Sequence, residues 1–133
     1  MKLTKTNLRK MKAQEPKNAV MRYVIDYVLE KYDDYDDKKK IFTDVLEHGC
    51  VSGIVGGLIY YSDTTKFYDK HAREINEMVR NEISDCGFNS PKDLFGDKWD
   101  ENDPFVEDIE NKNLLSWFGF ECKMRDLYYE FYE

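Results

Sequence analysis

Proline, cysteine and histidine are scarce in this chain, and no apolar run is long. Among 133 residues there are three prolines, three cysteines and two histidines. The longest apolar stretch, residues 50–61, is too short and too rich in glycine to span a bilayer. The basic N-terminus lacks the apolar segment of a secretory signal peptide. We therefore expect a cytoplasmic protein with no membrane segment.

The cysteines argue against a disulfide framework. Cys50, Cys86 and Cys122 lie far apart, their number is odd, and no CxxC pair occurs. This usage is typical of buried, reduced thiols in a cytoplasmic protein.

Recognisable catalytic motifs are also missing. The chain has neither a Walker P-loop nor a GxGxxG fingerprint. His48 and His71 lie near carboxylates and Cys50, but the second ligand pair that zinc sites usually show is absent. No local spacing forces a Cys50–His71 nucleophile. We expect no catalytic residue, no metal and no cofactor, and a protein that is not an enzyme.

The chain does have enough apolar material for one core, with 41% hydrophobic and 35% charged residues. Apolar residues recur at helical spacing in several segments. Residues 1–15 form either a flexible basic arm or a first helix. The fold class is therefore mainly α, a compact single domain of about five helices over residues 1–133. We predict these helices over residues 17–32, 38–48, 65–85, 92–95 and 113–132.

Residues 49–61, GCVSGIVGGLIYY, allow three interpretations. Gly49, Gly53 and Gly56 recur at helical intervals, which favours a buried helix with a smooth groove. A turn followed by a short strand or hairpin around residues 51–61 is the second. A phosphate-binding loop is the third, although its usual lysine is missing.

Several residues predict where helices begin and end. Residues 62–64, Ser-Asp-Thr, are expected to cap the helix that ends near residue 85. Gly87 is expected to terminate that helix, and Ser90 to cap the short helix after it. The loop over residues 96–108 carries Trp99 and Phe105, whose rings are expected to hold it against the body.

Charge is divided along the chain. Residues 1–40 carry a net charge of +4, whereas residues 82–133 carry −9. An acidic half repels nucleic acid, so we expect no direct binding to it. Spaced carboxylates can instead imitate phosphates in a basic channel, and an ordinary solvated acidic surface is the alternative. The predicted binding surface comprises Asp93, Asp97, Trp99, Asp100, Glu101, Asp103, Glu107, Asp108, Glu110, Tyr128 and Tyr129.

The run HGCVSGIVGGLIYYSDTTKFYDKHAREI, residues 48–75, resembles the core of a family of small phage and prophage proteins of unknown function. The resemblance covers the middle quarter of the chain. It implies a stoichiometric inhibitor of host defence, of the anti-CRISPR or antirestriction type. It also implies that the family's centre comprises Gly49, Gly53, Tyr60, Tyr61, Asp63, Phe67 and His71.

We therefore predict a non-enzymatic inhibitor that binds a host nucleic-acid-binding protein, with a CRISPR effector as the favoured partner. Acidic residues steer the binding and exposed aromatic residues anchor it. A homodimer through the glycine groove or the last helix stays open. The alternative function is a small-ligand or nucleotide binder, whose pocket comprises Gly53, Gly56, Tyr60, Tyr61, Asp63 and His71.

Overall fold

The computed structural model describes residues 1–14, 19–46 and 61–132. For residues 61–64 it describes the backbone but not the side chains. Within these residues the chain forms six α-helices and two short 3-10 helices, and no strand. The predicted mainly α class is confirmed. The helices are α1 Lys5–Ala13, α2 Ala19–Lys31, η1 Tyr32–Asp34, α3 Lys39–Leu46, α4 Tyr61–Cys86, α5 Pro91–Phe95, η3 Gly96–Lys98 and α6 Ile109–Tyr132.

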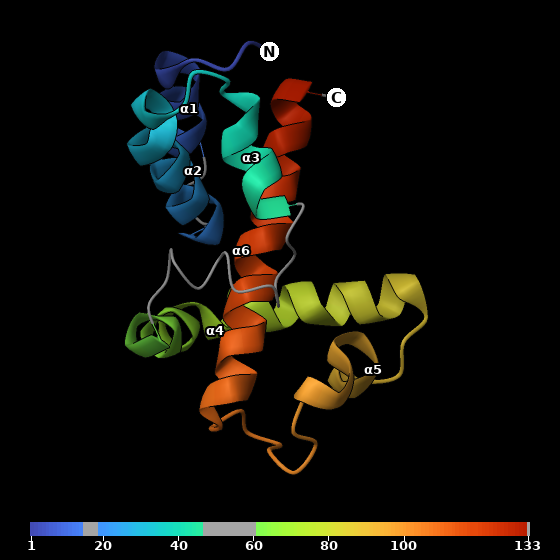
Figure 1. Cartoon of the computed structure of the whole chain (residues 1–133). Coiled ribbons are helices and arrows are strands. Elements are labelled where there is room, and N and C mark those ends of the chain that lie inside the picture. The colour runs from blue at the N-terminus through green and yellow to red at the C-terminus, as the bar shows by residue number, and fades with distance from the viewer. Residues whose placement is uncertain (15–18, 47–60, 133) are drawn as a thin grey trace.

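Helix α6 is the axis of the molecule. Figure 1 shows α1, α2 and α3 gathered around its C-terminal half, while α4 crosses its N-terminal half and α5 lies beside that crossing. The apolar residues of α6 surround much of its circumference, which is typical of a central helix.

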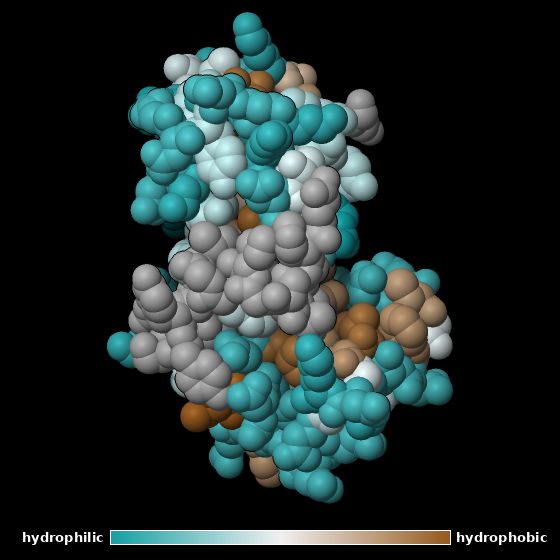
Figure 2. Space-filling view, viewed as in Figure 1, coloured by the Kyte–Doolittle hydropathy of each residue, from teal (hydrophilic) through white to brown (hydrophobic). Residues whose placement is uncertain are grey.

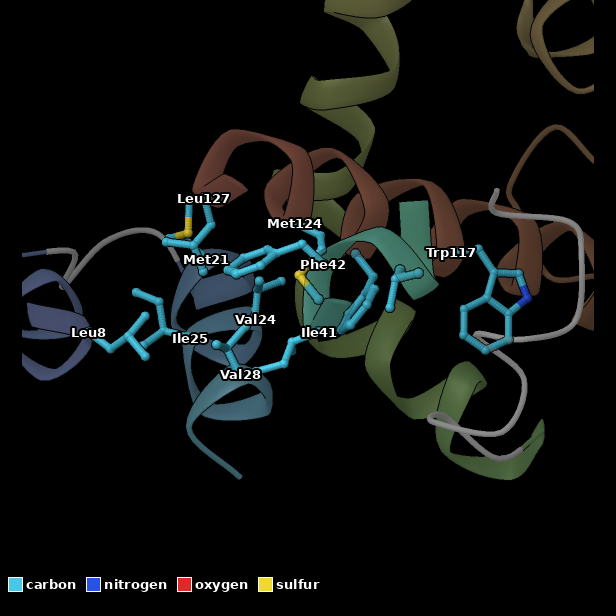
Figure 3. Packing of buried hydrophobic residues seen from close by; sticks show 12 residues of the cluster. Leu8, Met21, Val24, Ile25, Val28, Ile41, Phe42, Trp117, Met124 and Leu127 are labelled. Carbon is cyan, nitrogen blue, oxygen red and sulfur yellow. The ribbon is translucent and has the colours of Figure 1, made fainter. Parts of the chain in front are cut away.

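The first hydrophobic cluster joins α1, α2 and α3 to residues 117–127 of α6, as Figure 3 shows. Leu8 of α1 is fully buried in it, and the Thr4 side chain caps α1 by accepting a hydrogen bond from the Asn7 N–H at 3.0 Å. Of the two interpretations left open for residues 1–15, the first helix is the one that the structure has over Lys5–Ala13. The buried members are Leu8, Met21, Val24, Ile25, Val28, Ile41, Phe42, Val45, Trp117, Phe120, Met124 and Leu127.

The second cluster lies where α4 crosses α6. Gly119 makes the crossing close, because a Cβ atom there would lie 3.0 Å from Cγ1 of Ile75. Tyr23 packs against both clusters and joins them. The buried members are Val20, Phe67, Tyr68, Ile75, Val79, Trp99, Leu114, Leu115 and Phe118.

The C-terminal end of α4 lies where the sequence predicted it, whereas the N-terminal end does not. Tyr61 is already helical, so Asp63 lies inside the helix and its predicted role as a cap was wrong. Gly87 ends the helix in the left-handed conformation, φ 74°, as predicted. The Phe88 N–H reaches the Ile83 carbonyl at 2.9 Å, which completes a Schellman motif.

Two predictions about the other helices need comment. Residues 49–60, where helix and strand were both left open, lie outside the described residues. Helix α6 begins at Ile109, four residues before the predicted start. Asp108 explains the earlier start, because its carboxylate accepts a hydrogen bond from the Asn111 N–H at 3.1 Å and caps the helix.

Candidate functional site

Residues 93–110 form an acid-rich unit that we call the acidic lobe. It comprises most of α5, η3, the following loop and the first residues of α6. Eight carboxylates stand against Lys98 alone, so the lobe carries a formal charge equal to that of the whole chain, −7. Figure 2 shows a predominantly hydrophilic surface at this end of the molecule.

The side chain of Asn111 ties the lobe to α6. Asn111 is fully buried. Its Oδ1 accepts a hydrogen bond from the Asp100 N–H at 3.0 Å, and its Nδ2 donates to the Asp100 carbonyl at 2.9 Å. Nδ2 also donates to Oδ2 of Asp103 at 3.1 Å. A buried amide with all these groups paired gives the loop one conformation.

Several carboxylates of the lobe are used to build it. Asp103 accepts hydrogen bonds from the Glu107 N–H at 2.8 Å and the Asp108 N–H at 2.9 Å. The Asp93 carboxylate accepts one from the Asn89 N–H at 2.9 Å, and Asp100 accepts one from the Asn102 N–H at 2.9 Å. These side chains hold a rigid negative surface together, and each still contributes its charge to that surface.

Two exposed charges of the lobe are loosely paired. Asp97 and Glu101 both lie near the Lys92 ammonium group, at 3.7 Å and 3.9 Å. Exposed ion pairs of this length contribute about 0–1 kcal/mol to stability. Asp97 and Glu101 can therefore turn towards a partner with little loss of stability.

Asp103 makes the lobe sensitive to acid. Hydrogen bonding from the Glu107 backbone, followed by that from Asp108 and Asn111, holds the pKa of Asp103 below its usual value of 3.8. A lowered pKa stabilises the fold above the ordinary pKa, and that contribution disappears as the pH falls through the lowered value. We therefore expect the loop around Asp103 to open below about pH 4.

NMR measures this opening through the amide protons of Glu107 and Asp108. In the native protein both should lose their hydrogen-bonded chemical shifts as the pH falls below about 4. In Asp103→Asn that acid transition should be absent for these two amides. The same transition in both proteins would show that another carboxylate controls the loop.

Of the two aromatic residues of the loop, Trp99 holds it against the body as expected and Phe105 does not. Trp99 is buried and stacks on Phe95, with ring centroids 5.5 Å apart. Phe105 is 83% exposed, so its predicted role in holding the loop against the body was wrong. Val106 has a φ of 54°, which is rare for a β-branched residue, and it turns the chain directly after Phe105. The Asp-Pro pair before Phe105 is a turn signal that could have revealed this exposed tip.

A pocket of about 340 Å³ opens between α4, α5 and the lobe. Its apolar wall includes Val79, Trp99 and Leu115, and its polar wall includes Lys92, Glu101 and Asp103. An apolar wall beside a few charged groups is typical of a binding pocket. The sequence did not indicate it, because α4 and the lobe meet only in the tertiary structure.

One comparison with known proteins places the chain. A family model described as "Domain of unknown function (DUF7222)" matches residues 14–133. The chain belongs to the DUF7222 family. No curated protein and no solved structure matches it. The match begins directly after α1, so the DUF7222 domain comprises α2 to α6 with the acidic lobe.

The predicted binding surface is divided in this DUF7222 domain. Its acidic members gather in the lobe, whereas Tyr128 and Tyr129 lie at the other end of α6 (Figure 1). From Glu110 to Tyr129 the helix rises about 28 Å. Tyr128 packs its ring against Phe42 at 5.8 Å, and Tyr129 is 54% exposed. These two tyrosines therefore do not belong to the same contact surface as the lobe.

The predicted small-ligand pocket can be followed only at His71. Gly53, Gly56 and Tyr60 lie outside the described residues, as do the side chains of Tyr61 and Asp63. His71 is buried against Phe67, with ring centroids 4.7 Å apart, at a kink in α4. Burial lowers the pKa of its imidazole despite the nearby Glu74.

His71 lines a pocket of about 290 Å³ between α2 and α4 in the DUF7222 domain. Arg22 of α2 and Lys70 of α4 also line the pocket. Asp26 lines it too, and its carboxylate pairs with Lys12 at 2.7 Å. Two permanent cations can attract an anion to this face. Of the residues predicted for the glycine-rich pocket, His71 is the one that the described part of the chain places here.

Of the two described cysteines, Cys122 is partly buried and Cys86 is exposed, so the expected burial was wrong for Cys86. Burial raises the pKa of the Cys122 thiol to about 12, which disfavours the reactive thiolate. No group of three His, Cys, Asp or Glu side chains in the described ranges could hold a metal ion. No described helix is long and apolar enough to cross a membrane.

Proposed function

We propose that this protein is a non-enzymatic, phage-type inhibitor that acts in the host cytoplasm. In this proposal it binds a nucleic-acid-handling protein of host defence, with a CRISPR effector as the favoured partner. The carrying observation is the acidic lobe, where eight carboxylates stand against one lysine on a hydrogen-bonded framework. Such a surface complements the basic grooves that hold nucleic acid.

Phe105 supports this proposal as the anchor of the contact. It is 83% exposed at the tip of the loop, between residues of the acidic lobe. Aromatic side chains at the centre of an interface commonly supply much of its binding energy. Charges around the anchor would steer the encounter, so the association rate should fall as ionic strength rises.

A guide-directed DNA cleavage assay with purified CRISPR effector complexes tests the proposal. The first variant is the lobe triple mutant Asp97→Asn, Glu101→Gln and Glu107→Gln, which removes three exposed charges that no backbone N–H holds in the described structure. We expect the concentration for half-inhibition to rise at least about tenfold. Phe105→Ala should raise it by about tenfold as well.

The matched control changes three exposed acids outside the lobe. Glu30→Gln, Glu77→Gln and Glu130→Gln make the same change in net charge and should leave inhibition close to that of the native protein. An equal loss of inhibition in the two triple mutants would show that inhibition depends only on net charge. The proposal fails if the native protein neither binds nor inhibits any of the effector complexes.

A further inference from the structure

We infer that the pocket between α4, α5 and the acidic lobe receives a single arginine side chain of the protein partner. This inference rests on the proposed function, because it names the group that the lobe recognises. The pocket has a volume of about 340 Å³, near the lower limit of about 300 Å³ for ligand pockets. A site of this size suits one long side chain better than a whole nucleotide.

The pocket's apolar wall suits the stem and the plane of an arginine. Trp99 is 8% exposed and lines the pocket together with Val79 and Leu115. A guanidinium group is planar, weakly hydrated and attracted to an indole ring. Its three methylene groups can cover apolar surface while the charged end stays near the mouth.

The polar wall supplies the charge complement. Asp103 is fixed by the Glu107, Asp108 and Asn111 hydrogen bonds, so its carboxylate is already in place before a partner arrives. Glu101 is held only by a 3.9 Å ion pair and is free to turn towards an incoming cation. A fixed carboxylate and a movable one can grip a guanidinium from two sides.

Lys92 gives the inference a distinctive consequence. It is the only cation among the described residues that line the pocket, and it competes for Glu101. An arginine that enters the pocket must break the ion pair between Lys92 and Glu101, and its guanidinium must approach the positively charged Lys92. Removal of the Lys92 charge should therefore strengthen arginine binding, and the exposed Lys98, which does not line the pocket, is its natural control.

The test uses three pentapeptides that differ only in a central arginine, lysine or citrulline, flanked by Gly-Ser and Ser-Gly. Binding is followed by NMR at the indole N–H of Trp99, with the buried Trp117 of the other cluster as an internal reference. We expect the arginine peptide to shift the Trp99 signal. The lysine peptide should bind more weakly, and the neutral citrulline peptide should bind least.

Two matched pairs of variants locate the contact. Glu101→Gln should weaken binding of the arginine peptide about fivefold, whereas Glu130→Gln, outside the lobe, should change this affinity less than about twofold. Lys92→Gln should raise the affinity for the arginine peptide about threefold, and Lys98→Gln should leave this affinity nearly unchanged. Each pair makes the same change in net charge, so net charge alone cannot produce a difference within a pair.

Three results would overturn the inference. The first is an equal affinity for the arginine peptide in the two variants of each pair. The second is citrulline binding as tightly as arginine, or an arginine peptide that binds without moving the Trp99 signal. The third is a concentration-dependent dimer, seen by light scattering and weakened by Glu101→Gln, since the pocket would then hold a second copy. Inhibition in the cleavage assay is independent of these results, so failure of the pocket and failure of the proposed function remain distinguishable.

Discussion

Replacing Phe120 with alanine should lower the free energy of unfolding by about 3–5 kcal/mol. Phe120 is fully buried. Its ring forms T-shaped contacts with Tyr27 and Tyr23, with ring centroids 5.4 Å and 5.9 Å apart. Tyr23 in turn packs on Phe67 at 4.8 Å, in the second cluster. The cavity would therefore remove a shared contact between the two halves of the core, and a rigid core cannot collapse to fill it.

Urea denaturation followed by circular dichroism measures this loss. The matched control is Phe105→Ala, which removes the same atoms from an 83% exposed position and should change stability by less than about 0.5 kcal/mol. If the alanine variant of Phe120 does not fold, Phe120→Leu should still cost about 1 kcal/mol. A Phe120 variant as stable as the native protein would contradict the packing described for α2 and α6.

Replacing Asn111 with alanine should have the second-largest effect, a loss of about 2–4 kcal/mol. The variant leaves the Asp100 N–H and carbonyl without their partner and removes one donor from Asp103. Because the lobe depends on this side chain, much of the damage should be local. Hydrogen exchange should accelerate over residues 100–108 before the rest of the chain responds.

The control for Asn111 is Asn102→Ala. Asn102 is exposed and uses its backbone N–H to bond Asp100, so truncation of its side chain should change stability by less than about 0.5 kcal/mol. A third variant, Asn111→Asp, places a second anion beside Asp103. At neutral pH it should be less stable than Asn111→Ala. Similar exchange rates in the Asn111 and Asn102 variants would show that the lobe does not depend on the amide.

The loss of order in Asn111→Ala also bears on function. This substitution keeps every charge of the lobe but removes the framework that positions Phe105 and Glu101. If inhibition depends on a rigid surface, the variant should inhibit less than the native protein at the same net charge. Unaltered inhibition would mean that a flexible acidic segment is sufficient.

Local signals predicted much of this fold from sequence. The helical spacing of apolar residues predicted the long helix over residues 65–85, and α4 spans Tyr61–Cys86. Gly87 and Ser90 marked helix ends because a left-handed turn and a capping hydroxyl act within a few residues. Information of this kind is contained in neighbouring residues, so it can be read without the tertiary structure.

The acidic lobe shows what local signals could not decide. The charge of residues 93–110 is a property of the sequence alone. Which carboxylates hold the loop together depended on Asn111, eight positions beyond Asp103 and fully buried in the folded chain. Trp99 joins the second cluster as expected, whereas Phe105, for which the same role was expected, stays exposed at the loop tip.

The sequence by itself determined the mainly α class, the apolar spacing of α2, α4 and α6, and the concentration of negative charge near one end of the chain. Helix α6, which the sequence predicted over residues 113–132, carries Tyr128 and Tyr129 away from that charge to its opposite end. Only the tertiary structure formed the pocket beside Trp99. Helix periodicity acts over a few residues, whereas a surface or pocket depends on which distant segments pack together.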